Sequence, residues 1–214
     1  MNEAPVRSSM MRWATLALFA GLAACAAPAP APVLLTIPPA GAAAAAAAAP
    51  VSAASAAPAP ILAVRRVAIP EYLVARRVRF RADPSTLAEW PNTYWAERIE
   101  IGVSRAFNAA LRSRLPGWTL CDASCGDQVP TLAVQVEMVP MDYLRSSQTL
   151  KAHTRITVTT SSATPKVLQI AEASYELPSG GDNAQAQAQA IGELIGRVAA
   201  LAATTLEAAA RLAP

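Results

Sequence analysis

Three alternating segments decide the fold of this chain: residues 131–139 (TLAVQVEMV), 150–160 (LKAHTRITVTT) and 167–175 (VLQIAEASY). Apolar and more polar side chains alternate in each segment, which is typical of a strand with one buried face. A turn-like stretch, residues 161–165, separates the last two segments. Because strands that are neighbours in sequence and joined by short turns usually pair, the pattern predicts an antiparallel three-strand meander.

Two helices are predicted around this meander. The first is expected to be capped by Asn92 or Thr93 and to end at Pro116-Gly117. Its apolar positions recur at three and four residues, and they are Trp95, Ile99, Val103, Phe107, Ala110 and Leu111. The second runs over residues 183–212, with two favourably ordered pairs, Glu193 with Arg197 and Glu207 with Arg211.

Two further strands are predicted upstream of the first helix. Residues 62–69 form a β-branched run that is stopped by Pro70, and residues 70–73 form a connection. Residues 76–81 alternate, so that Arg77, Arg79 and Arg81 share one face, opposite Val78 and Phe80. The order of strands, helix, strands and helix predicts an α+β domain: a mostly antiparallel sheet with two helices packed on one face.

The N-terminus has the features of a signal peptide over residues 1–24. Arg7 and Arg12 precede an apolar run, residues 13–22, that is too short to span a bilayer. The run leads into Leu22-Ala23-Ala24-Cys25, which resembles the lipobox of bacterial lipoproteins. The resemblance implies that Cys25 becomes the first mature residue and is acylated on sulfur and nitrogen, and that Ala26 directs it to the outer membrane. The alternative is an ordinary secretory signal with an incidental cysteine.

Residues 25–60 are predicted to be a tether rich in alanine and proline. Residues 26–60 contain no charge, and eight consecutive alanines occupy positions 42–49. The island VLLTI at 33–37 is a candidate first strand of the domain that otherwise covers residues 61–214. The formal charge of the chain is only +3, which argues against a nucleic-acid partner.

The domain resembles the ABC-type transport auxiliary lipoproteins, a PqiC-like family that accompanies MCE-type lipid transport systems. The features that carry this resemblance are LLTIPP at 34–39, VAIPEYL at 67–73, WAERI at 95–99, the meander and the last helix. The chain departs from the family in having Val74-Ala75 where a polar residue is usual, and in its long tract at 40–60. The resemblance implies an outer-membrane lipoprotein on the periplasmic face that docks an MCE-domain protein and forms a homo-oligomer.

Arginines concentrate near the second predicted strand and are the first candidate site. Arg76, Arg77, Arg79 and Arg81 follow closely on Arg65 and Arg66, and the segment that carries all six has Glu71 as its single acid. They predict a surface for anionic lipid head groups or for an acidic partner. The alternative is a solvated pair of strands whose charges discourage edge-to-edge association.

The cysteines and the histidine offer a second set of candidates. Cys121 and Cys125 make an even pair once Cys25 is acylated, and an oxidising compartment favours a disulfide between them. The alternatives are a zinc site, which lacks nearby ligands, and a redox pair, whose usual spacing is C-x-x-C. His153 lies between Lys151 and Arg155 on the polar face of its strand, so we expect a solvated side chain.

No catalytic motif is visible in the sequence. The chain has no H-E-x-x-H, G-x-S-x-G, P-loop or dinucleotide fingerprint. We therefore expect a protein that is not an enzyme and that needs no cofactor or metal. Among the tryptophans, Trp95 is expected to anchor the core, whereas Trp90 fits either an exposed contact or a buried position. The leading hypothesis is an accessory lipoprotein of an MCE-type lipid transporter, and the alternative is a structural lipoprotein supporting another assembly, such as lipopolysaccharide export.

Overall fold

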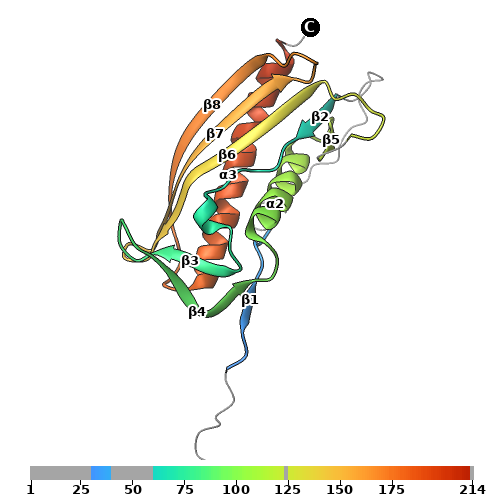
Figure 1. Ribbon diagram of the computed structural model, residues 1–214. Coiled ribbons are helices and arrows are strands. Elements are labelled where there is room, and N and C mark those ends of the chain that lie inside the picture. Colours follow the sequence, from blue (N-terminus) through green and yellow to red (C-terminus); the bar gives the residue numbers. More distant parts are fainter. Residues whose placement is uncertain (1–29, 40–59, 123–124, 213–214) are drawn as a thin grey trace, which may run out of the picture. The chain divides into compact units, whose positions relative to one another are not determined.

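A three-strand antiparallel meander forms the largest part of the sheet in the computed structural model, which describes residues 30–39, 60–122 and 125–212 (Figure 1). Its strands are β6 (Leu132–Leu144), β7 (Thr149–Thr160) and β8 (Val167–Pro178). The register runs continuously from Leu132↔Thr160 to Leu144↔Thr149, with one irregularity after Met138. The meander predicted from the alternation is confirmed, and its strands extend a few residues further.

The second edge of β6 carries two shorter strands, one at each end. β2 (Ile61–Val64) pairs with the first residues of β6, and β3 (Arg77–Arg81) pairs with its last residue. Outside these, β5 (Thr119–Cys121) pairs with β2, β4 (Leu87–Trp95) pairs with β3, and β1 (Val33–Leu35) pairs with β4. Only β3 with β4 is antiparallel among these pairs.

The parallel pairings were not predicted, although the sheet remains mostly antiparallel as expected. Parallel partners need a long connection, and β2 reaches β6 only after β3, β4, helix α2 (Ile99–Arg114) and β5. Local patterns of alternation carry no information about partners that lie so far apart in sequence. The strand predicted over residues 62–69 is shorter in the structure, where β2 ends at Val64. The residues after Val64 still run beside β6, held by isolated backbone hydrogen bonds such as that from the Ala68 N–H to the Val136 carbonyl, 2.9 Å.

The predicted start of the first helix was wrong. Residues 87–95 form β4, and α2 begins at Ile99 with Arg98 at its N-cap and no side-chain cap. Trp90, Thr93 and Trp95 are buried where β4 pairs with its neighbours, so this pairing overrides the helical spacing of Trp95 and Ile99. Asn92 has a positive φ of 49° and caps no helix.

The last helix, α3 (Ala184–Ala210), agrees with the prediction. Asn183 caps it, since its Oδ1 accepts a hydrogen bond of 2.8 Å from the Ala186 N–H. Glu193 and Arg197 form the expected ion pair at 2.7 Å. The helix lies against β6, β7 and β8 and packs beside α2, which confirms the α+β fold with both helices on one face of the sheet (Figure 1).

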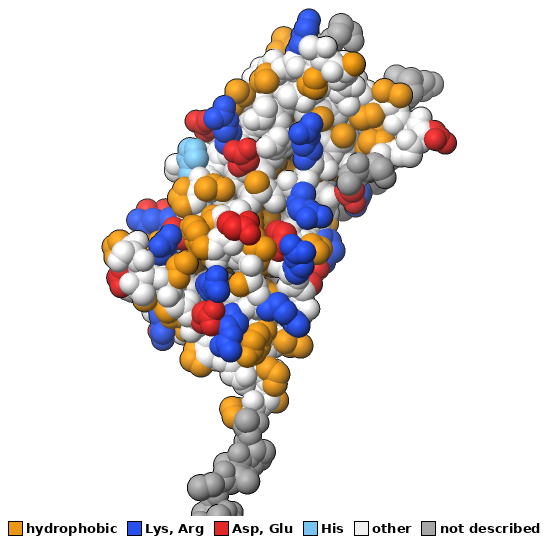
Figure 2. Space-filling model, viewed as in Figure 1, with side chains coloured by type: hydrophobic (Ala, Val, Ile, Leu, Met, Phe, Trp, Pro, Cys, Tyr) orange, Lys and Arg blue, Asp and Glu red, His pale blue; other side chains and the backbone are white. Residues whose placement is uncertain are grey.

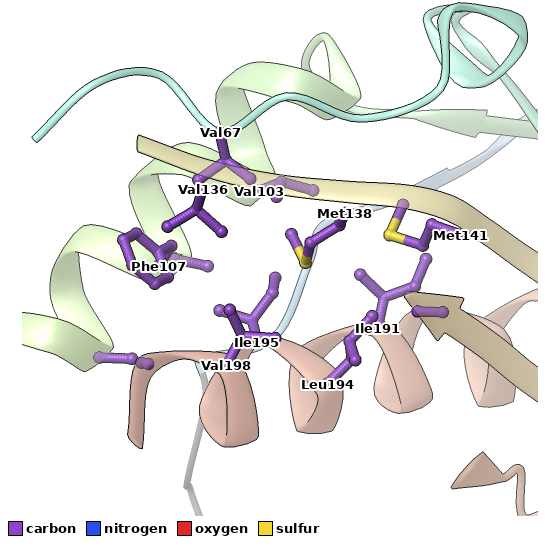
Figure 3. Packing of buried hydrophobic residues seen from close by; sticks show 14 of the residues in the cluster. Val67, Val103, Phe107, Val136, Met138, Met141, Ile191, Leu194, Ile195 and Val198 are labelled. Atoms are coloured by element: carbon purple, nitrogen blue, oxygen red, sulfur yellow. The ribbon is translucent and has the colours of Figure 1, made fainter. Parts of the chain in front are cut away.

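The core lies between the sheet and the two helices (Figure 3). Val136, Met138 and Met141 of β6 meet side chains of α3 such as Ile195, with Phe107 of α2 beside them. Each of these side chains is at most 1% exposed, so the hydrophobic effect drives the assembly of the three elements. Alanines line much of α3 and let it approach its neighbours closely.

The island at 33–37 joins this core as β1, which pairs with β4 rather than with β2, the next strand in sequence. Ile37 is 5% exposed, and Pro38 lies against Gly192 of α3. The described residues from Pro32 onward group into one compact unit that includes β1. The connection 70–73 contains a short 3-10 helix, Glu71–Leu73.

Candidate functional site

The predicted arginine strand is β3, and its two faces differ as expected. Val78 and Phe80 are at most 5% exposed, whereas Arg77, Arg79 and Arg81 point to the other face. Arg76 directly precedes the strand and is exposed. The alternation of the sequence therefore places these charged side chains together on the surface.

Glu89 of β4 lies opposite the first two arginines of β3. Its carboxylate oxygens are 3.4 Å from Arg77 Nη1 and 3.2 Å from Arg79 Nε. A second contact also fixes the Arg79 side chain, because its Nη1 donates a 2.8 Å hydrogen bond to the Tyr72 carbonyl. Exposed pairs of this kind stabilise a fold only modestly, so their main effect is to balance charge.

Arg81 belongs to a tighter cluster with Asp142 and Tyr72. Its Nε lies 3.1 Å from Asp142 Oδ1, and its guanidinium stacks 5.0 Å from the centre of the Tyr72 ring. The Tyr72 hydroxyl donates a 2.9 Å hydrogen bond to the same carboxylate oxygen. Burial and, after it, the bond to Asp142 raise the pKa of Tyr72. Hydrogen bonds with Tyr72 and Asp142 raise the pKa of Arg81, so both side chains keep their usual protonation at neutral pH.

A further arginine of this region was missed by the sequence analysis. Arg145 lies 4.6 Å from the ring centre of Trp90 and 5.1 Å from that of Phe80. Its guanidinium donates two hydrogen bonds to Asp182, at 2.8 and 3.2 Å. Nothing in the local sequence marks Arg145, because its partners come from β3, β4 and the turn before α3. Trp90 itself is 6% exposed, so its side chain packs inside the domain.

Most arginines on the face of β3 are engaged in ion pairs, although four arginines face two carboxylates. Arg77 and Arg79 share Glu89, Arg81 pairs with Asp142, and only Arg76 has no ion pair within the described residues. A cavity of about 360 Å³ adjoins Arg81, but acids and bases both line it, namely Asp83, Asp142 and Lys151. This surface suits a partner with polar groups of both signs better than a purely anionic one.

The other two arginines of the predicted cluster lie elsewhere. Arg65 and Arg66 follow β2 and line a hollow together with Arg105 and Arg112 of α2. Arg65 also lines a second hollow with Gln135 and Thr157, on the face of the sheet that points away from the helices. The hollow between this segment and α2 has a volume of about 480 Å³, and we call it the arginine groove. Sequence reasoning noted Arg65 and Arg66 but missed their helical counterparts, which lie some forty residues away in the chain. The spacing of Arg105 and Arg112 on an exposed helical face was the one available signal.

Cys121 and Cys125 are joined by a disulfide, with a Cα–Cα distance of 5.1 Å. The Cys121 Sγ also lies 3.4 Å from the Leu62 carbonyl, next to the pairing of β5 with β2. The Nδ1 atom of His153 lies 3.2 Å from the Ser174 hydroxyl on the exposed face of the meander. Within residues 30–39, 60–122 and 125–212, no three His, Cys, Asp or Glu side chains form a group that could hold a metal ion.

The comparisons with known proteins agree with this fold. A family model for the ABC-type transport auxiliary lipoprotein component matches residues 43–203. The chain belongs to this family. The resemblance seen in the sequence is thereby confirmed, and the ABC-type transport auxiliary lipoproteins have an accessory role in transport by ABC-type systems.

Solved structures share the fold of this auxiliary lipoprotein at low sequence identity. The crystal structure of an uncharacterized protein has a TM-score of 0.64 and 15% identity, over 83% of this chain and 99% of the other. A DUF330 family protein from Xanthomonas campestris has a TM-score of 0.58 and 16% identity, over 70% and 85% of the two chains. Curated proteins include no match to this chain.

The lipidation site predicted for the auxiliary lipoprotein, Cys25, lies outside the described residues, as do the signal peptide and most of the tether. Among the helices that the structure describes, none has the length and apolar character required to cross a bilayer.

Proposed function

We propose that this auxiliary lipoprotein is anchored in the outer membrane through acyl groups on Cys25 and serves an MCE-type ABC system that moves lipid across the Gram-negative envelope. The observation that carries the proposal is the family match over residues 43–203 in a chain whose LAAC sequence ends at Cys25. Several acyl chains hold a protein to a bilayer far more firmly than one. The periplasmic domain then acts by binding and assembly, without catalysis.

The segment after Cys25 supports this arrangement. Residues 26–32 (AAPAPAP), between Cys25 and β1, consist only of alanine and proline, a composition typical of a semi-rigid spacer. β1, at residues 33–35, already belongs to the folded unit, so only a short stretch separates it from Cys25 in the sequence. The anchor would thus keep the domain close to the membrane surface, with its far side accessible to a partner rooted in the inner membrane.

The partner is proposed to be an MCE-domain protein. The test is crosslinking in the native envelope, followed by purification of the lipidated protein and identification of its partners by mass spectrometry. We expect an MCE-domain protein and the permease and ATPase of one ABC system. Recovery of lipopolysaccharide export components in their place would favour the alternative, structural role. A clean monomer that captures neither an MCE protein nor phospholipid would refute the proposal.

We also propose that the protein assembles as a homo-oligomer. Among the described strands, β8 pairs only with β7, so its outer edge is open over twelve residues. Val167 and Ile170 on this strand are 58% and 47% exposed. Long open edges with apolar side chains readily pair with another strand.

Sedimentation of the lipidated protein in detergent tests the oligomer. Ile170→Lys should shift the protein to smaller species, because a charge on an edge strand discourages pairing. Val129→Lys, at a loop position that is 79% exposed, should leave the assembly unchanged. A wild-type protein that sediments as a monomer would exclude this part of the proposal.

A further inference from the structure

We propose that the arginine groove binds the phosphate diester head group of a phospholipid. The groove lies between α2 and the segment that follows β2, on a face where Figure 2 shows several basic side chains. The basic residues of its lining are Arg66, Arg105 and Arg112, with Arg65 shared with the hollow on the other face of the sheet, and Asp122 is the single acid. The inference rests on the groove alone and goes beyond the proposed role in transport, which requires no lipid site on this chain.

One wall of the groove is the exposed face of α2. Ile101, Arg105, Asn108 and Arg112 follow each other at three or four residues, so they form one stripe along the helix. The opposite stripe of α2, which includes Val103 and Phe107, is fully buried in the core. The helix therefore cannot rotate to turn its arginines away from the groove.

The other wall is fixed to α2 by hydrogen bonds. Ser104 accepts a 3.1 Å bond from the Val67 N–H and donates a 2.7 Å bond to the Glu100 carbonyl. The backbone N–H of Arg65 is bonded to the Val134 carbonyl of β6 at 3.0 Å. Asn108 Nδ2 lies 2.5 Å from Asp122 Oδ1 at the end of β5. The backbone that carries the arginines is thus held in place before any ligand binds, which lowers the entropic cost of binding.

The charges of the groove are largely unmatched, in contrast to those of β3. Arg105 is paired with Glu97, whereas Arg65, Arg66 and Arg112 form no ion pair within the described residues. Guanidinium groups donate paired hydrogen bonds whose geometry fits a phosphate. A concave surface also concentrates the field of like charges. The groove therefore offers an anion arginine side chains that no carboxylate of the described chain already pairs.

The remaining lining indicates a lipid head group as the source of this phosphate. Val64, Ile101 and Ala109 are apolar residues of the lining, which suits the glycerol carbons and the first methylenes of a lipid. A volume of about 480 Å³ falls in the range of small-molecule sites.

Titration calorimetry of the full, lipidated protein in a non-ionic detergent tests the site. The probes are glycerophosphoglycerol, which is a water-soluble phosphate diester head group, inorganic phosphate and glycerol. We expect saturable binding of the diester, at least tenfold weaker binding of inorganic phosphate and no binding of glycerol. Arg66→Gln and Arg112→Gln should each weaken diester binding about tenfold, the effect of one lost charge-assisted hydrogen bond.

Arg76→Gln is the matched control, because Arg76 is an exposed arginine without an ion pair in the described chain and lies outside the groove. It should leave the affinity unchanged. An equal loss of affinity in this variant would show diffuse charge attraction and overturn the site. Inorganic phosphate that binds as tightly as the diester would overturn the lipid assignment, and absence of saturable diester binding would overturn the inference entirely. None of these outcomes depends on an MCE partner.

Discussion

Gln187 shows how one buried polar side chain links three elements. Its Oε1 accepts a 2.7 Å hydrogen bond from Trp90 Nε1 of β4, and its Nε2 donates a 2.7 Å bond to the Arg79 carbonyl of β3. The side chain is 4% exposed and comes from the first turn of α3. This amide therefore links the arginine strand and β4 to α3, in addition to the apolar contacts of Val78 and Phe80 in the core.

Replacing Gln187 by leucine should lower the free energy of unfolding by about 2 kcal/mol, because the Trp90 N–H and the Arg79 carbonyl would lose their partner. Urea denaturation measures the effect. Gln189→Leu is the control, since Gln189 lies on the exposed face of the same helix. Equal losses in the two variants would contradict the role assigned to Gln187.

Tyr72 makes the stability of the β3 region dependent on pH. Its pKa is raised above the usual value of about 10, first by burial and then by the hydrogen bond to Asp142. A phenol with a raised pKa in the folded state contributes stability that is complete below pH 10 and is lost as the pH rises through the folded pKa.

We therefore expect the free energy of unfolding to decrease above pH 10, and to decrease less in Tyr72→Phe. Tyr175, whose pKa burial also raises, contributes a similar decrease in both proteins, so the difference between them reports Tyr72. Asp142→Asn should lower the pKa of Tyr72, as measured by absorbance titration against Tyr72→Phe. A raised pKa in Asp142→Asn would contradict the assignment.

At the scale of elements, the contact between residues 33–39 and α3 relies on a glycine. A Cβ added to Gly192 would lie 2.9 Å from Pro38 Cγ and 3.1 Å from the Pro38 carbonyl oxygen. Since the second of these atoms belongs to the backbone, the segment would have to move as a whole. This close approach is what seats Ile37 in the core.

Gly192→Ala is expected to destabilise the domain even though alanine is the better helix former. Overpacking lowers the free energy of unfolding by about 1 to 3 kcal/mol, whereas the higher helix propensity of alanine raises it by about 1 kcal/mol. Thermal and urea denaturation should show the net loss. The control is Gly117→Ala, where an added Cβ has no atom within 4 Å. A Gly192→Ala protein more stable than the wild type would show that Pro38 does not hold its position against α3.

At the scale of the whole molecule, the proposed acyl anchor on Cys25 lies outside the described residues, so it needs a test of its own. Cys25→Ser should abolish incorporation of labelled palmitate and prevent removal of residues 1–24, because acylation and cleavage both require the thiol. Cys121→Ser keeps Cys25 and should still be labelled, which makes it the control. Fractionation of the envelope measures the location, and a labelled Cys25→Ser protein would exclude Cys25 as the site.

Sequence alone determined the meander, α3 and the two faces of β3. In each of these, the side chains that share a face are two, three or four residues apart, so a local pattern records their burial. The tertiary structure decided which strands pair with each other and which charged side chains meet. β4 replaced the expected helix start because its partners are β1 and β3, and Arg81 gained Asp142 from a strand some sixty residues later.

The arginines illustrate the same division at the candidate site. Sequence by itself placed six of them in one short region and indicated a charged surface. Only the tertiary structure separated them, since Glu89 and Asp142 form ion pairs with those of β3, while Arg105 and Arg112 of α2 line a groove together with the two that follow β2. The physical reason is that a charge acts through its distances in space, and packing sets these distances between residues that are remote in the chain.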